Sequence, residues 1–205
     1  MKQENKLSKE ELKTIDYYDQ NAPEWSEKHS RGTMFDLDME LLFKLLPEGK
    51  MLEVATGSGE DATKLLAHYG IENYIGTDAS TGLIRIAKKR NPKANLIHLS
   101  IYDLEKLSQK FDGFWISAML IHVPKDKFQI ALKSLKSALS GGAIGFISIM
   151  EGSADMEESR PGRHYSLWEA SKFEKELKDA KFEIINSRRT ETNASPWLAY
   201  ILKKV

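Results

Sequence analysis

Residues 50–62, KMLEVATGSGEDA, decide how this chain folds. They contain a short apolar run that ends at Val54 and is typical of a buried strand, and a helical pattern that begins at Glu60. Gly57 and Gly59 lie in the turn between these two elements. Glycine permits a positive φ and leaves room for a ligand beside the backbone, and the free N–H groups at a helix start face the same space. The segment therefore predicts a nucleotide-type ligand site, with a plain strand-to-helix turn as the alternative.

Two carboxyl groups narrow the kind of ligand. Glu53, at the end of the expected strand, would repel a pyrophosphate and attract a ligand that carries an ammonium or sulfonium charge. Asp78 ends the next expected strand, roughly 20 residues after Gly59, which is the spacing of an acid that holds ribose hydroxyls. An aspartate that only caps the following helix gives the same pattern, so both interpretations of Asp78 stay open.

The turn also fits a dinucleotide fingerprint. Gly57, Gly59 and Ala62 occupy the pattern G-x-G-x-x-A, so an NAD-dependent oxidoreductase is an alternative. Glu53 argues against it. The expected ends of the chain also argue against it, because two helices precede the motif and two strands close the chain where a second mononucleotide half would be expected.

Strand-like and helical segments alternate after the turn. The expected strands are 51–54, 73–77, 95–99, 113–117 and 143–149, and the expected helices between them are 63–69, 83–90 and 128–139. This order predicts an α/β fold, a doubly wound, Rossmann-like and mainly parallel sheet with helices on both faces. Ligands of such sheets bind at the carboxyl ends of the strands.

The two ends of the chain add further elements. Two helices, 8–21 and one within 37–46, are expected before the motif. The C-terminal part contains a helical segment, 168–180, and then two strand-like runs, 182–188 and 197–202. The connection between these runs is too short for a crossover, so we expect an antiparallel hairpin that completes a seven-stranded sheet.

Composition excludes several kinds of partner. The chain has 205 residues, and its 30 Lys plus Arg balance 30 Asp plus Glu, so no attraction to nucleic acid or to an anionic membrane is expected. There is no cysteine, and His29, His68 and His98 show no metal-ligand spacing, so we expect no metal. No apolar run approaches the roughly 20 residues of a membrane span. We expect a cytoplasmic protein of one domain, and its oligomeric state stays open.

These features together resemble the class I S-adenosylmethionine-dependent methyltransferases. The match is carried by EVATGSG at 53–59 and GTDAS at 76–80, and FDGFWISAMLIHVP at 111–124 resembles the fourth-strand segment of a bacterial, small-molecule-type branch of that family. Further matching stretches are YYDQNAPEW at 17–25, LSGGAIGFIS at 139–148 and SPWLAYIL at 195–202. The resemblance implies one methyltransferase domain over 1–205, with an N-terminal helical cap at 1–48, a Rossmann-like core at 49–205, and S-adenosylmethionine as cofactor.

The resemblance also implies which residues hold that cofactor. Glu53 and the loop that follows it would hold the methionine part, and Asp78 would bind the ribose. The adenine would lie beside Ala79 and Tyr102. The full set that it implies is Tyr18, Trp25, Glu53, Ala55, Thr56, Gly57, Gly59, Asp78, Ala79, Ser100, Ile101, Tyr102, Ser117, Ala118 and Met119.

Three positions depart from the family pattern. Ala55 replaces a frequent first glycine, and Leu139-Ser140 replaces Lys-Pro. Ser100 stands where many relatives place an aspartate that binds adenine. A serine hydroxyl makes one hydrogen bond but lacks the charge that makes a carboxylate a stronger acceptor. Asp103 is expected to substitute if its loop reaches the adenine.

Methyl transfer from a sulfonium is an in-line displacement, which chiefly requires alignment of the reactants and exclusion of water. An O–H or N–H acceptor must also lose a proton. The catalytic candidates are His122 after the fourth strand, Glu151 after the fifth, and Tyr165. A histidine that only shapes the turn is the alternative interpretation of His122.

The polar stretch 151–167 has the composition of a lid or a solvated loop, and Arg160, Arg163 and His164 within it are further candidates for binding an acceptor. The sequence therefore predicts methyl transfer to the oxygen, nitrogen or sulfur of a small molecule. A protein that binds S-adenosylmethionine without catalysis is a second alternative, beside the NAD-dependent oxidoreductase.

Overall fold

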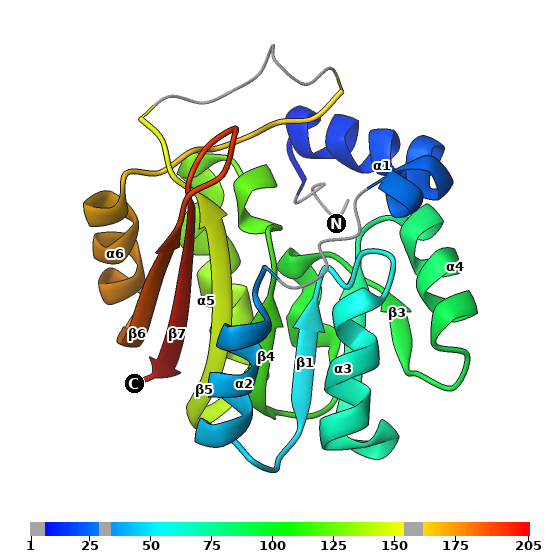
Figure 1. Ribbon diagram of the computed structural model, residues 1–205, viewed down its shortest axis with the longest axis horizontal. Coiled ribbons are helices and arrows are strands. Elements are labelled where there is room, and N and C mark those ends of the chain that lie inside the picture. Colours follow the sequence, from blue (N-terminus) through cyan, green and yellow to red (C-terminus); the bar gives the residue numbers. More distant parts are fainter. Residues whose placement is uncertain (1–6, 29–33, 154–161) are drawn as a thin grey trace, which may run out of the picture.

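The computed structural model describes residues 7–28, 34–153 and 162–205. The described residues form a seven-stranded sheet in the order β3-β2-β1-β4-β5-β7-β6 (Figure 1). Neighbouring strands are parallel from β3 to β5, and β7 is antiparallel to both β5 and β6. The strands are β1 Met51–Val54, β2 Tyr74–Asp78, β3 Leu96–His98, β4 Phe111–Ile116, β5 Leu139–Met150, β6 Phe182–Thr190 and β7 Trp197–Lys204. The expected α/β fold with a C-terminal antiparallel hairpin is confirmed.

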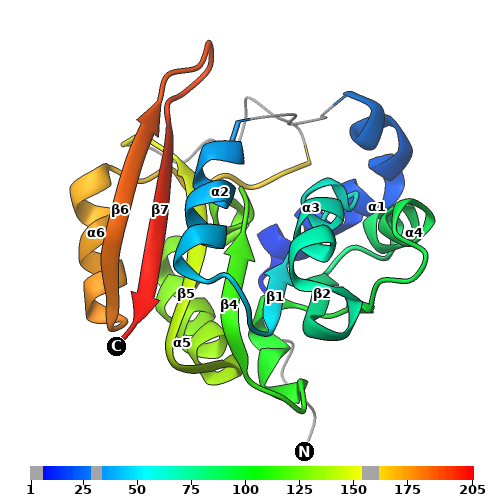
Figure 2. The ribbon, with the colours of Figure 1, turned by 60° about the horizontal axis from the view of Figure 1, so that its bottom comes forward.

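Helices cover both faces of the sheet, as Figures 1 and 2 show. The α-helices are α1 Lys9–Lys28, α2 Asp36–Leu45, α3 Glu60–Tyr69, α4 Thr81–Arg90, α5 Phe128–Ala138 and α6 Ala170–Asp179. Four short 3-10 helices are η1 Ile71–Asn73, η2 Ile101–Lys106, η3 Leu120–His122 and η4 Lys125–Lys127. Side chains from α2, α3 and α4 form one core, and those from α5, α6 and η2 form the other.

The alternation of side chains along a strand explains the two cores. In β4, Phe114 and Ile116 contribute to the core under α5, whereas Trp115 between them contributes to the core under α2 and α3. Both faces of this strand are therefore buried, and its residues 114–116 (FWI) are apolar without alternation, as is typical of a parallel sheet covered on both sides.

Two predicted boundaries were wrong. The first helix continues to Lys28 although Pro23 lies inside it and has no N–H to donate to the Asp19 carbonyl four residues earlier. The fifth strand begins at Leu139, before the two glycines that were expected to precede it. Pairing with β4 extends β5 backwards across these glycines, with a shift of register between Phe111 and Gly113.

We predict that Gly145→Ala destabilises the sheet. A Cβ at this position in β5 would lie 2.3 Å from atoms of the Phe114 ring on β4, which is fully buried. Overpacking of this kind lowers the free energy of unfolding by about 1–3 kcal/mol. Gly141→Ala, in the same strand but with open space around its Cβ, is the matched control in urea unfolding. Equal midpoints for the two variants would contradict the prediction.

Candidate functional site

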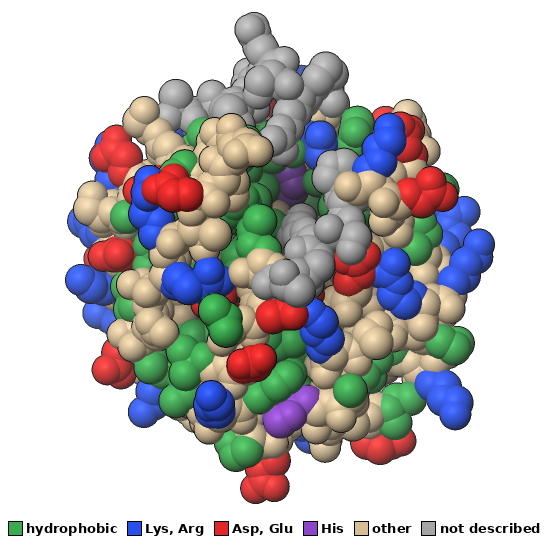
Figure 3. Space-filling view, viewed as in Figure 1, with side chains coloured by type: hydrophobic (Ala, Val, Ile, Leu, Met, Phe, Trp, Pro, Cys, Tyr) green, Lys and Arg blue, Asp and Glu red, His purple; other side chains and the backbone are tan. Residues whose placement is uncertain are grey.

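A cavity lies at the carboxyl ends of β1, β2 and β4, with α1 above it (Figures 1 and 3). Its empty volume is about 1100 Å³ when the open space at its mouth is included. Its wall contains every residue that was expected to bind the cofactor except Gly59. The other lining residues are Leu7, Glu11, Thr14, Ile15, Val54, Ser58, Glu60, Asp61, Ser80, Leu83, Leu99, His122 and Val123. The structure therefore places almost all of the residues that the sequence predicted to bind the cofactor in one cavity wall.

The glycine turn has the backbone conformation that its sequence predicts, but its two glycines serve different purposes. Gly57 has a φ of 57° and lies under the Trp25 ring, 3.8 Å from where a Cβ would be. Gly59 has a φ of 81°, and a Cβ there would lie 3.0 Å from the Cα of Ala87 and 2.8 Å from the Asn91 amide nitrogen. Gly59 is thus needed for packing of the turn against α4 rather than for ligand approach.

Two alanines in the cavity wall adopt a conformation that favours glycine. Ala55 has a φ of 61° and Ala118 a φ of 54°. A left-handed residue with a Cβ costs roughly 1–2 kcal/mol. Ala55 therefore adopts a backbone conformation that a glycine would adopt without this cost, and backbone strain of this kind is common at functional sites.

Glu53 is held at the end of β1 by neutral donors. Its side chain is buried, and the hydroxyls of Tyr74 and Thr56 both donate to Oε2. Burial raises the pKa of Glu53 to about 8, the charge of Asp61 adds to the increase, and the two hydrogen bonds only partly oppose it. The negative charge that the sequence predicted at this position is therefore largely absent at pH 7 before a ligand binds.

Asp78 accepts two backbone hydrogen bonds at the same edge of the sheet. Gly57 N–H donates to Oδ2 at 2.9 Å, and Ser80 N–H donates to Oδ1 at 2.8 Å. Burial raises the pKa of Asp78 to about 6, and these backbone bonds moderate the increase. Each carboxylate oxygen keeps one acceptor position. The cap of α4 is Ser80, whose hydroxyl accepts from Leu83 N–H, so Asp78 is not needed as that cap.

The structure also shows how α1 is attached beside the cavity, which the sequence did not reveal. Asp19 Oδ1 accepts hydrogen bonds from the hydroxyls of Ser80 and Thr81 and from Gly82 N–H. Burial acts to raise the pKa of Asp19, but these bonds outweigh it and lower the value. A charged Asp19 therefore fixes α1 to the start of α4. The only sequence signal is that Asp19 lies inside the YYDQNAPEW stretch.

His122 lies in the cavity wall, and its bonds fix its tautomer. Nδ1 is 2.7 Å from the His164 carbonyl oxygen, and Nε2 is 3.0 Å from the Tyr18 hydroxyl. A carbonyl only accepts, so Nδ1 carries the proton, and in the neutral ring Nε2 accepts from Tyr18. Nε2 is then the basic atom of this imidazole.

The other catalytic candidates lie elsewhere. Tyr165 is buried, and its ring contacts the His122 ring with centroids 4.9 Å apart. Glu151 pairs with Arg189 at 2.5 Å, and among the described residues that line the cavity neither Tyr165 nor Glu151 is present. The proposed lid residue Arg160 and also His29 lie outside the described residues. Arg163 lies 4.6 Å from the centre of the Tyr17 ring.

Two further findings concern the described part of the chain only. Within 7–28, 34–153 and 162–205, no group of three or more His, Asp or Glu side chains is arranged to hold a metal ion. No helix within the same ranges is long and apolar enough to cross a membrane.

We predict that Glu53→Gln makes the ligand-free protein more stable at pH 8. The Glu53 carboxyl ionises near 4.5 when exposed and near 8 when folded, so between these values the folded state binds the extra proton. The wild type then loses stability as the pH rises through this window. A glutamine side chain does not titrate in this window, so it avoids the loss of stability. Its amide oxygen can still accept hydrogen bonds from Tyr74 and Thr56.

Urea unfolding of the wild type and of Glu53→Gln at pH 5, 6, 7 and 8 measures the effect. Glu48→Gln changes an exposed side chain and serves as the control, with a pH profile parallel to the wild type. A parallel profile for Glu53→Gln as well would show that this carboxyl does not titrate in the window.

The chain was also compared with known proteins. A family model described as "Methyltransferase domain" matches residues 51–142, and no curated protein matches the chain.

Solved structures share the fold at low identity, and three of them are described here. The DhpI–SAH complex is 16% identical, with a TM-score of 0.73 over 95% of this chain and 97% of that one. The Burkholderia thailandensis 1,6-didemethyltoxoflavin-N1-methyltransferase is 15% identical, with a TM-score of 0.75 over 98% and 93%. The Synechocystis PCC 6803 magnesium protoporphyrin IX methyltransferase is 15% identical, with a TM-score of 0.73 over 98% and 100%.

The domain match and the fold agree with the family that the sequence motifs indicated. Residues 51–142 thus match a methyltransferase domain, and the chain shares its fold with solved structures of methyltransferases.

Proposed function

We propose that this protein transfers a methyl group from S-adenosylmethionine to an oxygen, nitrogen or sulfur atom of a small molecule. The observation that carries the proposal is that Glu53 and Asp78 line one cavity together with the glycine turn. One acid suits an ammonium group and the other suits a ribose, and the two occupy adjacent strand ends. When bound, the cofactor supplies an electrophilic methyl group on a charged sulfur.

The residues of the cavity fit such a ligand. Gly57 and the left-handed Ala55 leave the backbone open beside the end of β1. The free acceptor positions of Asp78 are available to two ribose hydroxyls. Glu53 would hold the ammonium group of such a ligand in its ionised form, and it would then release its proton to solvent on binding. The neutral donors around Glu53 keep it in place in both protonation states.

For an O–H or N–H acceptor, His122 is the final base: the acceptor would give its proton to the Tyr18 hydroxyl oxygen while that hydroxyl gives its own proton to His122 Nε2. It lines the cavity, and its Nε2 is the basic atom on the side of Tyr18. Tyr165 supports the ring through an edge contact. Glu151 is the weaker candidate because Arg189 neutralises its carboxylate outside the cavity wall.

Two comparisons support a small-molecule acceptor. The printed names of two fold relatives describe methyltransferases of a toxoflavin precursor and of magnesium protoporphyrin IX. The balanced charge of this chain offers no general attraction to nucleic acid. The dinucleotide alternative is disfavoured, because an antiparallel hairpin of β6 and β7 occupies the sheet edge where a second mononucleotide half would continue.

We predict saturable binding of S-adenosylhomocysteine in calorimetry, and about tenfold or greater weakening by Glu53→Gln, because a charged hydrogen bond to the ammonium group is lost. Glu151→Gln, which changes a carboxylate outside the cavity wall, should bind like the wild type. Binding of NAD that Glu53→Gln strengthens, without binding of S-adenosylhomocysteine, would overturn the proposal.

The affinity should also depend on pH. Since Glu53 must ionise on binding and its pKa is raised to about 8, the affinity is expected to increase as the pH rises from 6 to 8, by up to about tenfold per unit. Glu53→Gln should remove this increase. A wild-type affinity that is constant over this range would contradict the expected proton release.

Catalysis needs a separate test. Labelled S-adenosylmethionine, incubated with the protein and a metabolite extract, should transfer its methyl label to a small molecule. His122→Asn should slow this transfer while S-adenosylhomocysteine binding stays within a few-fold of the wild type. Cofactor binding without any transfer would favour the non-catalytic alternative.

A further inference from the structure

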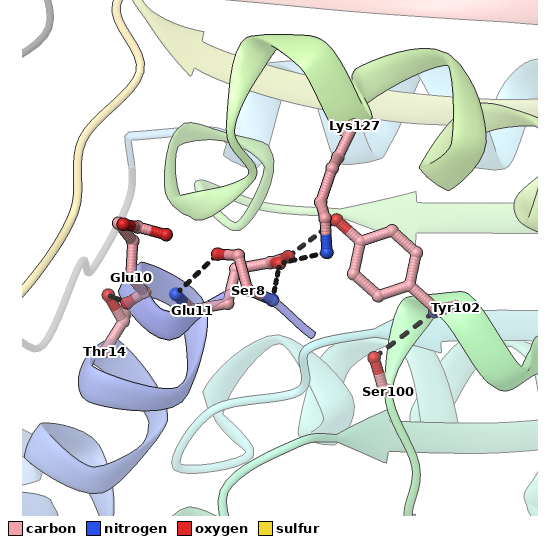
Figure 4. A network of polar contacts seen from close by, with 7 residues as sticks. All are labelled: Ser8, Glu10, Glu11, Thr14, Ser100, Tyr102 and Lys127. Carbon is pink, nitrogen blue, oxygen red and sulfur yellow. Dashed lines mark hydrogen bonds and ion pairs between the residues drawn. The ribbon is translucent and has the colours of Figure 1, made fainter. Parts of the chain in front are cut away.

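Glu11 is a buried carboxylate that the proposed mechanism does not use. It lies in the first turn of α1, is only 5% exposed, and lines the cavity together with Ser100, Ile101 and Tyr102. Figure 4 shows its side chain close to Tyr102 and Lys127. Burial of a charged group is costly unless it is paired and hydrogen-bonded. A carboxylate at this place therefore requires an explanation.

Part of the explanation is local. Ser8 and Glu11 form a capping box, in which Ser8 N–H donates to Glu11 Oε2 at 2.8 Å and Glu11 N–H donates to the Ser8 hydroxyl at 3.2 Å. Lys127 Nζ lies 3.3 Å from the same Oε2. These contacts are made on the side of Oε2, so they do not account for Oε1.

Oε1 faces η2, the segment that follows β3. The Tyr102 hydroxyl donates to it at 2.6 Å. Burial, together with this bond, raises the pKa of Tyr102, so the phenol stays a donor. A carboxylate oxygen has two acceptor positions. Within the described residues Oε1 accepts this one bond, so one of its acceptor positions is left over, and Glu11 lines the cavity.

The same part of the cavity lacks the carboxylate that the family pattern places at position 100. The Ser100 hydroxyl accepts from Tyr102 N–H at 3.3 Å and so caps η2. Asp103, the expected substitute, lies 3.1 Å from Lys106 Nζ, and it is not among the described residues that line the cavity. Glu11 is therefore the carboxylate that the cavity wall presents next to Ser100 and Tyr102.

We infer that Glu11 Oε1 accepts a hydrogen bond from the 6-amino group of the cofactor's adenine, in place of the acid that is absent at position 100. The inference rests on the proposed function. The amino group of adenine is a donor, and the Glu11 carboxylate, with Lys127 Nζ 3.3 Å from its Oε2, is a strong acceptor. A residue of α1 then completes the adenine site, although Glu11 precedes Glu53, the first residue of the glycine motif, by 53 − 11 = 42 positions.

This contact would link the adenine side of the cavity, near Glu11, to the side that contains Tyr18 and His122. α1 also carries Tyr18 and Trp25, which line the cavity near His122 and Gly57. A hydrogen bond from the adenine to Glu11 holds α1 down at its N-terminal end, whereas Asp19 holds it farther along. Cofactor binding therefore stabilises the position of Tyr18 beside His122.

The test compares two ligands in calorimetry: S-adenosylhomocysteine and its purine analogue, in which hydrogen replaces the 6-amino group. The wild type should prefer S-adenosylhomocysteine by about tenfold or more, because the analogue leaves a buried charged acceptor unpaired. Glu11→Ala should lower this preference to less than about threefold, because neither ligand then finds an acceptor at this position. Glu11→Gln should lower it in part, because an uncharged amide oxygen is a weaker acceptor. The preference is a ratio, so a general loosening of α1 does not change it.

Two further variants serve as controls. Asp103→Asn removes the competing carboxylate and should keep the wild-type preference. Tyr102→Phe removes one donor to Oε1 while Glu11 stays, so the preference should be kept or increased. Circular dichroism of each variant checks that it is folded, and Tyr102→Phe tests the inference even where a change at Glu11 prevents folding.

The outcomes separate the inference from the proposed function. If the wild type binds S-adenosylhomocysteine tightly but binds the purine analogue equally well, the role of Glu11 is overturned. The proposed function is then unaffected. Equal weakening of both ligands by the Glu11 variants shows that Glu11 only anchors α1. If neither ligand binds the wild type, the proposed function fails and the inference fails with it.

Discussion

The structure depends on carboxyl groups that are buried around one cavity and held by neutral donors. Glu53 is bonded by two hydroxyls, and Asp78 by two backbone N–H groups. Neutral donors do not compensate fully for the loss of water, so both pKa values are raised. A lysine or arginine in their place would stabilise the folded protein, but it would repel a cationic ligand. The site is therefore arranged for binding at the expense of stability.

Helix α1 completes the site because acidic side chains attach it at two places. Glu11 contacts Tyr102 and Lys127 on one side of the cavity, and Asp19 contacts the start of α4 on the other. Glu11 contacts η2, which follows β3, and Asp19 contacts the start of α4, which follows β2. The helix is thus positioned by the same sheet edge that positions the cofactor residues, and ligand contacts on either side of the cavity act on one rigid element.

Much of the fold and most of the cavity wall could be predicted from the sequence, because the glycine turn and the alternation of elements are local signals. The raised pKa of Glu53 could not, since it arises from burial of this side chain in the folded chain and from the charge of Asp61. The role of Gly59 depends on its approach to Ala87 of α4. Glu11 has the sequence pattern of a capping box, and nothing in that pattern indicates that one oxygen faces a cavity.

The charge of the wall also bears on how the ligand leaves. On the proposed function, methyl transfer neutralises the sulfur, so the wall keeps its acidic groups while the ligand loses one positive charge. Glu53 has a pKa of about 8 without ligand, and it takes up a proton again when the ammonium group departs. No lysine or arginine is present among the described residues of the wall. The same buried acids that disfavour the empty site therefore bind the charged donor more tightly than the neutral product.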